Sequence, residues 1–378
     1  MKVYLDNAAT TPIHSEVIKE MTQMMSHQFG NPSSIHTYGR EVRVAIEDAR
    51  KRIARLLNAS PSDIFFMSGG TEANNMAIRC SIMDLGLKHA ITSRIEHHAV
   101  LHTIEDLEHR GLISLSFVNV DEKGHVDLDH LEKLLLENGK SLVSLMHANN
   151  EIGTILPLKE VGLICRKHNA IFHSDTVQTM GHFPHDLSTL QIDFITCAAH
   201  KFHGPKGIGF LYINNSNVKI KPLITGGAQE RNLRGGTENI YGIIGLAKAL
   251  EIAYLNMKED KVYITMLKHH MIDKLKIQIP DVDFNGEISE DSLYTVLNVS
   301  LPPTDIGEML LFNLDIAGIA ASGGSACSSG SEIGSHVLQG IKSDTNRPAV
   351  RFSFSRYNTI EEIDYAVEKL KEMLLVKV

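Results

Sequence analysis

"IDFITCAAHKFHGPKGIGFLYI" (192–213) joins two apolar runs through a short segment that holds a lysine, Lys201. The runs, 192–197 and 207–213, are largely apolar and do not alternate cleanly with polar residues. This pattern is typical of strands that other layers cover on both faces, as in parallel sheets. Lys201 would then lie just beyond the end of the first strand, where open α/β sheets bind ligands.

Similar runs precede this stretch and are separated by segments with helical periodicity. This alternation predicts an α/β fold with a mostly parallel sheet flanked by helices. One helix is expected at 40–58, where apolar residues from Val42 to Leu57 share one stripe. The other expected strands are "IFFM" (64–67), "HAITS" (89–93), "ISLSFVNV" (113–120), "SLVSLMHA" (141–148) and "AIFHSD" (170–175).

The length of 378 residues exceeds what one ordinary hydrophobic core serves, so we expect two lobes. A large lobe at 13–240 would carry the sheet. A smaller α+β lobe at 241–378 would include the apolar segment "LYTVLNVSL" (293–301) and a closing amphipathic helix from Ile360. Residues 1–12 would join the smaller lobe.

Charge and hydropathy narrow the function classes. The net charge of -8 argues against a surface dedicated to nucleic acid, which would need a clustered basic footprint. No apolar run approaches the roughly 18 residues of a membrane span, and the N-terminus does not resemble a signal peptide. We therefore expect a cytoplasmic protein with no direct nucleic-acid or membrane partner.

Four cysteines occur far apart, with no CxxC pair to suggest zinc or a dithiol site. Cys80, Cys165 and Cys197 have apolar neighbours and are expected to be small buried hydrophobes. Cys327 differs, because it lies in the Gly- and Ser-rich stretch "SGGSACSSGSEIGS" (322–335). Its thiol is the candidate for reactivity.

Two further segments could carry chemistry, each with a plainer alternative. "SGGTEANNMAI" (68–78) follows a strand and opens a helix, which suits a single phosphate; otherwise Thr71 is a helix cap in a glycine-rich turn. Asp175 ends a strand and is either a cap or the partner of a pyridinium nitrogen. Lys201 is either a Schiff-base lysine or a solvated loop residue.

His97 and its neighbours allow two interpretations. His98 and His102 are four residues apart and could share a helix face as metal ligands. The sequence shows no third ligand and no HExxH glutamate, so no metal site is expected. An imidazole of His97 stacked on a flat cofactor ring fits better, with a structural histidine as the alternative.

Taken together, the motifs resemble those of the class V aminotransferase group of pyridoxal-phosphate enzymes, and within it the NifS/IscS-type cysteine desulfurases. The ordered set covers nearly the whole chain and is specific as a set. The motifs are "YLDNAATTP" (4–12), "GNPSSIHTYG" (30–39), "SGGTEANN" (68–75), "EHHAV" (96–100), "HANNEIG" (147–153), "SDTVQ" (174–178), "HKFHGPKGIG" (200–209), "GGAQERNLRGGTEN" (226–239), "SGGSACSSG" (322–330) and "VRFSFSRYNT" (350–359).

The resemblance implies a set of residues that hold pyridoxal 5'-phosphate. Lys201 would bond the cofactor covalently, Asp175 would pair with the ring nitrogen and His97 would stack on the ring. Thr237 would reach the phosphate of the neighbouring subunit, which implies a homodimer with shared sites. The other implied contacts are Asn150 and Gln178 beside the ring, and Gly70, Thr71 and His200 at the phosphate.

The resemblance also implies the reaction. Arg351, with Asn7, would bind the carboxylate of L-cysteine, since a planar fork suits that group. Cys327 would take the substrate sulfur as a persulfide and leave L-alanine, with His97 and Lys201 moving protons. The Cys327 segment is expected to be a long mobile arm, as in the long-loop desulfurases. The persulfide would pass to an acceptor protein for iron–sulfur cluster assembly or for tRNA or cofactor thiolation.

The sequence departs from the family pattern at two places, and three alternative functions stay open. Family members commonly have Ser or Thr where this chain has Ala198, and losing that hydrogen bond would weaken cofactor retention by roughly 1.5–3 kcal/mol unless it is replaced. The chain ends soon after its last helix, which leaves the acceptor open. The alternatives are a selenocysteine lyase or related lyase, a cysteine-nucleophile hydrolase, and a non-catalytic sulfur relay.

Overall fold

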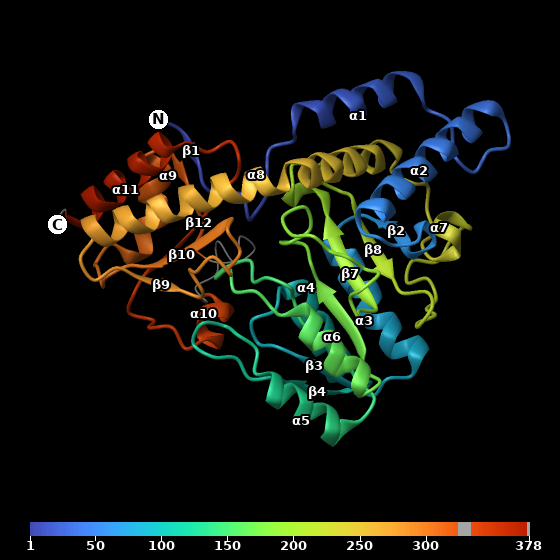
Figure 1. Cartoon of the computed structure of the whole chain (residues 1–378), viewed down its shortest axis with the longest axis horizontal. Helices are drawn as coiled ribbons and strands as arrows, with labels where there is room; N and C mark the ends of the chain where they lie inside the picture. The colour runs from blue at the N-terminus through green and yellow to red at the C-terminus, as the bar shows by residue number, and fades with distance from the viewer. Residues whose placement is uncertain (324–333, 376–378) are drawn as a thin grey trace.

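The computed structural model describes residues 1–323 and 334–375, and it places a seven-stranded sheet between layers of helices (Figure 1). The strand order is β2-β8-β7-β6-β5-β3-β4. Only β8 (Gly209–Ile213) runs antiparallel to its neighbours, β2 (Ile64–Met67) and β7 (Phe194–Ala198); the other pairs are parallel. The remaining strands are β3 (His89–Thr92), β4 (Ser114–Phe117), β5 (Leu142–Ser144) and β6 (Ile171–Asp175). The predicted α/β class is confirmed, and each predicted run of the large lobe contains or overlaps one of these strands.

The strands are apolar on successive residues because both faces of the sheet are buried. Phe66 and Phe172 face one core, while Phe65 and Ile171 face the other, as the twofold period of a strand requires. The first face is covered by helices α2 (Thr37–Leu56), α5 (Leu128–Asn138), α6 (Leu158–Lys167) and the first half of α8 (Ile240–Gln278). The second face is covered by α3 (Gly70–Leu85) and α4 (His98–His109).

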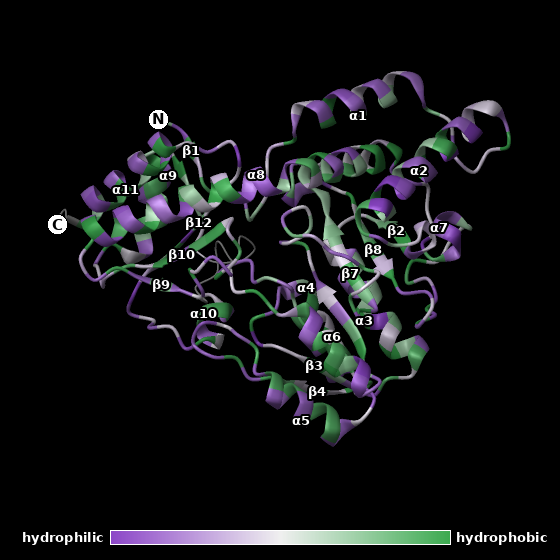
Figure 2. Cartoon of the chain, in the orientation of Figure 1, coloured by the Kyte–Doolittle hydropathy of each residue, from purple (hydrophilic) through white to green (hydrophobic). Residues whose placement is uncertain are grey.

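A second core, which we call the small lobe, forms around a three-stranded antiparallel sheet. Val3 and Leu5 belong to this core. In Figure 1 the small lobe lies at one end of α8, and in Figure 2 its strand β10 is hydrophobic while α11 carries both hydrophilic and hydrophobic colouring. Its elements are β9 (Asp283–Asn285), β10 (Val296–Ser300), β12 (Ala349–Ser353), the pair β1 (Val3–Tyr4) and β11 (Ile319–Ala320), α9 (Leu310–Ile316) and α11 (Ile360–Leu375).

Helix α8 belongs to both cores. Its residues up to Ala253 pack on the sheet, and those from Ile264 pack in the small lobe. By length and composition α8 could span a membrane, but 56% of its apolar window is buried in the protein, so the two cores account for its apolar side chains. The boundary expected between residues 240 and 241 stays a prediction. The remaining elements are α1 (Ser15–His27), the short helices α7 (Gln229–Asn232) and α10 (His336–Gly340), and the 3-10 turns Pro61–Asp63, Ala199–Lys201 and Gly307–Met309.

Lys268 is buried in the small lobe, where its Nζ donates to Ser292 Oγ at 2.7 Å and to the Leu293 carbonyl oxygen at 3.2 Å. Burial lowers the pKa of Lys268 to about 8. From about pH 8 to about 10.4, the usual lysine value, the unfolded chain holds a proton that the native chain lacks, so stability rises with pH across this window. We predict that Lys268→Met removes this rise, which is on the order of 3 kcal/mol.

The measurement is the thermal midpoint of both proteins between about pH 7 and 10. Lys258→Met is the matched control, because Lys258 lies on the same helix and is exposed. An unchanged pH dependence in Lys268→Met would show that Lys268 does not titrate in this window.

Candidate active site at the carboxyl edge of the sheet

A cavity of about 240 Å³ lies where β2, β3, β5, β6 and β7 end, at the carboxyl edge of the parallel part of the sheet. Nine residues expected at the site line this cavity together: Gly70, Thr71, His97, Asn150, Asp175, Gln178, His200, Lys201 and Arg351. They come from segments spread over most of the chain. The fold therefore brings the predicted cofactor and substrate residues around one space.

One end of the cavity is built for an anion. Gly70 and Thr71 form the first turn of α3, whose unpaired N–H groups and partial positive charge attract a phosphate. A Cβ at Gly70 would lie 2.7 Å from Val177 Cγ2, so only glycine allows this close approach. His200 lines the same end, and burial with nearby lysines lowers its pKa to about 4, so it would meet a phosphate as a neutral imidazole.

The anion end opens onto a shallower basin of about 370 Å³, lined in part by Ser68, Gly69 and Lys206. Ala9, Gly70, Thr71 and His200 line both spaces. Ala198 also lines the cavity and, as expected, offers no hydroxyl there. The phosphate end is thus reachable from outside this chain.

Asp175 lies at the end of β6, 5% exposed, with both carboxylate oxygens occupied. Oδ1 accepts from the Val177 N–H at 3.0 Å, and Oδ2 accepts from Asn74 Nδ2 at 2.7 Å. Asn74 Oδ1 lies 3.1 Å from His173 Nε2, and burial lowers the pKa of His173 to about 4. Neutral His173 therefore carries its proton on Nε2 and fixes the amide orientation of Asn74, which aims a donor at Asp175.

Lys201 ends the 3-10 turn that follows β7. Its Nζ donates to the backbone oxygens of Ala8, at 2.5 Å, and Ala9, at 3.0 Å. The segment after β1 thus forms one wall of the cavity and holds the lysine amine inside it. These contacts argue against the alternative that Lys201 is a solvated loop residue.

His97 is the N-cap of α4, and its Nδ1 accepts from the Ala99 N–H at 3.1 Å. Burial lowers the pKa of His97, and the charges of Lys201 and His336 add to this effect while Asp175 opposes it. A neutral ring whose Nδ1 accepts a hydrogen bond carries its proton on Nε2. Nε2 is therefore the atom at which His97 would exchange a proton.

The neighbouring histidines were the candidate metal ligands. His98 stacks on His102 and on His336, with ring centroids 4.5 and 4.4 Å apart. Within residues 1–323 and 334–375 no group of His, Cys, Asp or Glu has the arrangement of a metal site. The three rings stack rather than converge on one point.

Glu96, next to His97, is fully buried and was not singled out from the sequence. Its Oε1 accepts from the Met146 N–H at 2.9 Å and from Ser93 Oγ at 3.1 Å. Burial, with a smaller contribution from the charge of Asp175, raises the pKa of Glu96 to about 8. Glu96 is therefore mainly protonated at neutral pH.

Arg351 lies on β12 of the small lobe and is 1% exposed. Its Nη1 donates to the Asn150 carbonyl oxygen at 2.9 Å, and Nη2 pairs with Asp6 Oδ1 at 2.9 Å. Its Nε is buried and has no hydrogen-bond partner among the described residues. A guanidinium held on two sides, with an unused donor, suits the carboxylate of a small substrate.

Three predicted residues lie elsewhere. Asn7 lines an adjoining space of about 20 Å³, and its Nδ2 donates to the Ser353 carbonyl oxygen at 2.9 Å. Thr237 is exposed and lines a separate cavity of about 150 Å³. Cys327 lies outside the described residues. The chain before it is tied to the site, because the Arg351 N–H donates to the Ser322 carbonyl oxygen at 2.6 Å.

The donors fit a phosphorylated pyridine aldehyde. The cavity has an amine at Lys201, a carboxylate at Asp175 for a ring nitrogen, a neutral imidazole at His97 and a helix N-terminus for a phosphate. Beside them lies an arginine with a free donor. The arrangement supports chemistry at the Cα of a small amino acid.

Comparisons with known proteins agree with this geometry. The family model "Aminotransferase class-V" matches residues 3–366. A cysteine desulfurase IscS of Dictyoglomus turgidum is 45% identical over 377 residues, covering 99% of this chain and 94% of that protein. A solved NifS-like protein superposes with a TM-score of 0.91 at 39% identity, covering 99% of each chain. A structure of SspA in complex with cysteine gives 0.81 at 31% identity, covering 95% of this chain and all of that one.

Proposed function

Because the chain belongs to the class V aminotransferase family, we propose that it is a pyridoxal-phosphate-dependent cysteine desulfurase, which converts L-cysteine to L-alanine and keeps the sulfur as a persulfide. The observation that carries the proposal is the single cavity that Lys201, Asp175 and Arg351 line together. Relatives that the chain matches over 99% of its length are cysteine desulfurases.

We propose that the cofactor residues act as their positions suggest. Gly70, Thr71 and His200 would hold the phosphate, and Asp175 would bond the ring nitrogen. When bound, the cofactor supplies an electron-withdrawing ring that stabilises negative charge at the substrate Cα. Asn150 and Gln178, which are 8% exposed on the cavity wall, would flank the ring.

The chain's own groups then handle the protons and the sulfur. Arg351 would bind the substrate carboxylate and orient the Cα–H bond. Lys201 Nζ would take the Cα proton, and His97 Nε2 would exchange the proton of a thiol. The Cys327 thiolate would attack the substrate sulfur and break its C–S bond, while carbon Cβ gains a proton. L-cysteine and one thiol thus become L-alanine and one persulfide, with no outside oxidant.

The direct test is the reaction of the purified protein with L-cysteine. A coloured protein that forms L-alanine and a protein-bound persulfide in equal amounts would support the proposal. A colourless protein that gains no absorbance on adding pyridoxal phosphate would favour a cysteine-nucleophile hydrolase instead.

We further propose a homodimer with shared sites. The anion end of the cavity is open to a basin on this chain's surface, so a residue of a second copy has access to it. Thr237, exposed on its own chain, would reach the partner's phosphate. Exposed apolar side chains near α1 and α2 would be covered in the same dimer; they include Phe29, Ile35, Tyr38 and Val44, which are 57–89% exposed.

The recipient of the sulfur is proposed from the persulfide itself. A persulfide on Cys327 would pass to a cysteine of an acceptor in iron–sulfur cluster assembly or in tRNA or cofactor thiolation. The three described cysteines are free and buried, which is consistent with the proposed cytoplasmic location. Co-purification followed by transfer of labelled persulfide sulfur would identify the acceptor.

Arg351→Lys should raise KM for L-cysteine by about 10- to 100-fold and change kcat less. A lysine keeps the charge but lacks the planar fork and the Nε donor, so it loses carboxylate binding common to ground and transition states. Steady-state alanine formation gives both constants. Arg347→Lys is the control, since Arg347 bonds Ser300 and Asp281 outside the cavity; equal effects of the two variants would remove Arg351 from the substrate site.

A further inference from the structure

The segment that carries Thr237 contains a left-handed turn without glycine. Glu230, Arg231 and Asn232 have φ of 43°, 56° and 67°. Left-handed backbone costs such residues roughly 1–2 kcal/mol each, and it persists only where the surroundings over-determine it. Contacts elsewhere in the chain must therefore hold this turn.

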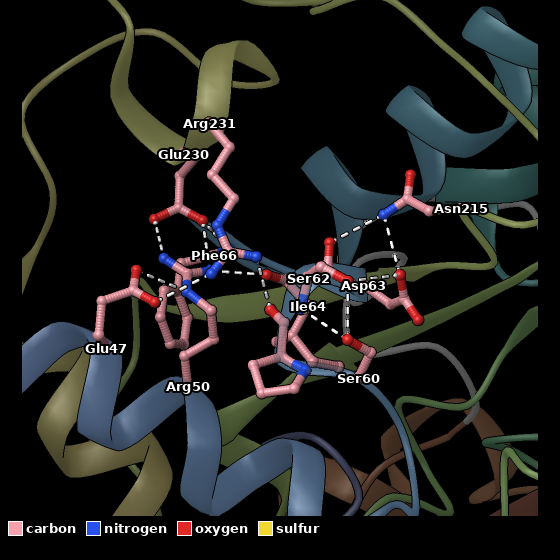
Figure 3. Close-up of polar contacts among 11 residues, drawn as sticks. Glu47, Arg50, Ser60, Ser62, Asp63, Ile64, Phe66, Asn215, Glu230 and Arg231 are labelled. Carbon is pink, nitrogen blue, oxygen red and sulfur yellow. Dashed lines mark hydrogen bonds and ion pairs between the residues drawn. The ribbon is translucent and has the colours of Figure 1, made fainter.

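The strongest of these contacts is a buried ion pair between Glu230 and Arg50 of α2 (Figure 3). Arg50 Nη2 and Nη1 donate to the two Glu230 oxygens at 2.8 and 2.9 Å, and the residues are 2% and 5% exposed. Glu230 Oε2 also accepts from the Phe66 N–H at 2.8 Å. Such two-donor charged pairs are the most directional in proteins. The turn is thus fixed to β2, whose end leads into Gly70.

Two further side chains of the same segment, Arg231 and Arg234, also bond to helices of the large lobe. Arg231 Nη2 bonds Glu47 Oε2 at 2.9 Å, but this pair lies at the surface and so adds little. Arg234 Nε bonds Glu72 Oε1 on α3 at 2.9 Å. Glu230 and Thr237 line the same cavity of about 150 Å³. Glu230, Arg234 and Thr237 therefore border one space, within a single segment of eight residues.

We infer that Arg50 and Glu230 are positioning residues for Thr237: their ion pair holds the left-handed turn in the geometry that presents Thr237 to the partner subunit's cofactor phosphate. This inference rests on the proposed shared site. A solely structural ion pair would stabilise its own chain, whereas a positioning pair must alter cofactor retention in the other subunit.

The first test removes the pair without leaving a lone buried charge, which would itself unfold the site. Arg50→Met with Glu230→Gln keeps an oxygen for the Phe66 N–H. The matched control is Arg52→Met with Glu251→Gln, because Arg52 lies on the same helix and bonds Glu251 of α8 at 2.7 Å, away from residues 224–239. Cofactor dissociation, followed by absorbance with an aldehyde trap, should be at least about tenfold faster than in the control, as loss of one charged hydrogen bond implies.

The thermal midpoint of each protein shows whether faster cofactor dissociation merely reflects a less stable fold. Equal dissociation rates in the two double variants would overturn the inference. If the Arg50 and Glu230 double variant does not fold, Arg50→Lys repeats the comparison, since lysine keeps the charge and loses the two-donor geometry. A dissociation rate about two- to fivefold above wild type is then expected, and a wild-type rate would overturn the inference.

The second test uses mixed dimers made with two affinity tags. One chain carries Arg50→Met and Glu230→Gln with Lys201 intact, and the other carries Lys201→Ala with the ion pair intact. The site with an intact Lys201 then receives Thr237 from the chain with an intact turn, so retention should return to the wild-type rate. A defect confined to its own chain would not be rescued, and that outcome would overturn the inference.

The same mixed-dimer experiment with Thr237→Ala distinguishes two failures: that of the positioning role of Arg50 and Glu230, and that of the shared site on which this role rests. Rescue of Thr237→Ala without rescue of the ion-pair variant would leave the shared site standing and reject the role of Arg50 and Glu230. A Thr237→Ala homodimer with wild-type retention would reject the shared site, and the inference would fall with it.

Discussion

Lys201→Ala should abolish covalent attachment of pyridoxal phosphate and reduce alanine formation from L-cysteine by at least about 10²–10⁴-fold. In the wild type the Lys201 amine lies in the cavity, where the oxygens of Ala8 and Ala9 hold it. An alanine removes both the group that bonds the cofactor and the base for the Cα proton. No other lysine lines this cavity, so no described residue can replace it.

The measurement combines the visible spectrum with borohydride reduction and peptide mapping, which should place the cofactor on the peptide that contains Lys201. Lys219→Ala is the control, because Lys219 is exposed just after β8 and should leave the spectrum unchanged. Covalent attachment that persists in Lys201→Ala would show that another amine bonds the cofactor.

The sheet and much of the site could be predicted because their signals are local. Strands buried on both faces must be apolar on successive residues, and the runs around Phe65 and Phe172 have that pattern. Asp175 ends one such run and Lys201 lies just beyond the end of the next, so their positions at one edge follow from parallel pairing. Buried sites for Cys80, Cys165 and Cys197 followed from apolar neighbours and are confirmed.

Other features depend on contacts between distant segments, and no local pattern marks them. The backbone oxygens of Ala8 and Ala9 meet Lys201 because the N-terminal segment pairs with β11 in the small lobe and also bonds His200, next to the lysine. Asn74 is the exception, because it follows Thr71 by three residues in "SGGTEANN" (68–75), a spacing that places both on one face of the helix, toward Asp175.

The left-handed turn could not be predicted from the sequence for a different reason. Glycine is the residue expected in such backbone, and the segment 226–239 is rich in glycine. The left-handed positions are instead Glu230, Arg231 and Asn232, and Glu230 is held there by the ion pair to Arg50. The sequence alone could not pair Glu230 with a residue 180 positions away.

Cys327→Ser should keep the cofactor spectrum and form no protein-bound persulfide from L-cysteine. Cys327 lies outside the described residues, so its assignment depends on its motif and on the other three cysteines. Burial raises the pKa of the Cys80 thiol to about 12 and also raises the pKa values of Cys165 and Cys197. At pH 7 these thiols are therefore almost entirely protonated, whereas a few per cent of an unperturbed cysteine is thiolate. These three thiols are therefore poor nucleophiles.

Mass spectrometry of the protein after brief exposure to L-cysteine should find the extra sulfur in wild type and in Cys80→Ser, but not in Cys327→Ser. Full sulfide release by Cys327→Ser, with ordinary thiols limiting, would remove Cys327 as the nucleophile. Turnover of L-selenocysteine distinguishes a cysteine desulfurase from a selenocysteine lyase, because a selenium-specific lyase can work without a nucleophilic thiol. If Cys327→Ser turns over L-selenocysteine as fast as wild type and neither protein forms a persulfide, the chain is a lyase. Persulfide in wild type alone makes Cys327 the sulfur carrier, because the cavity residues are the same in both proteins.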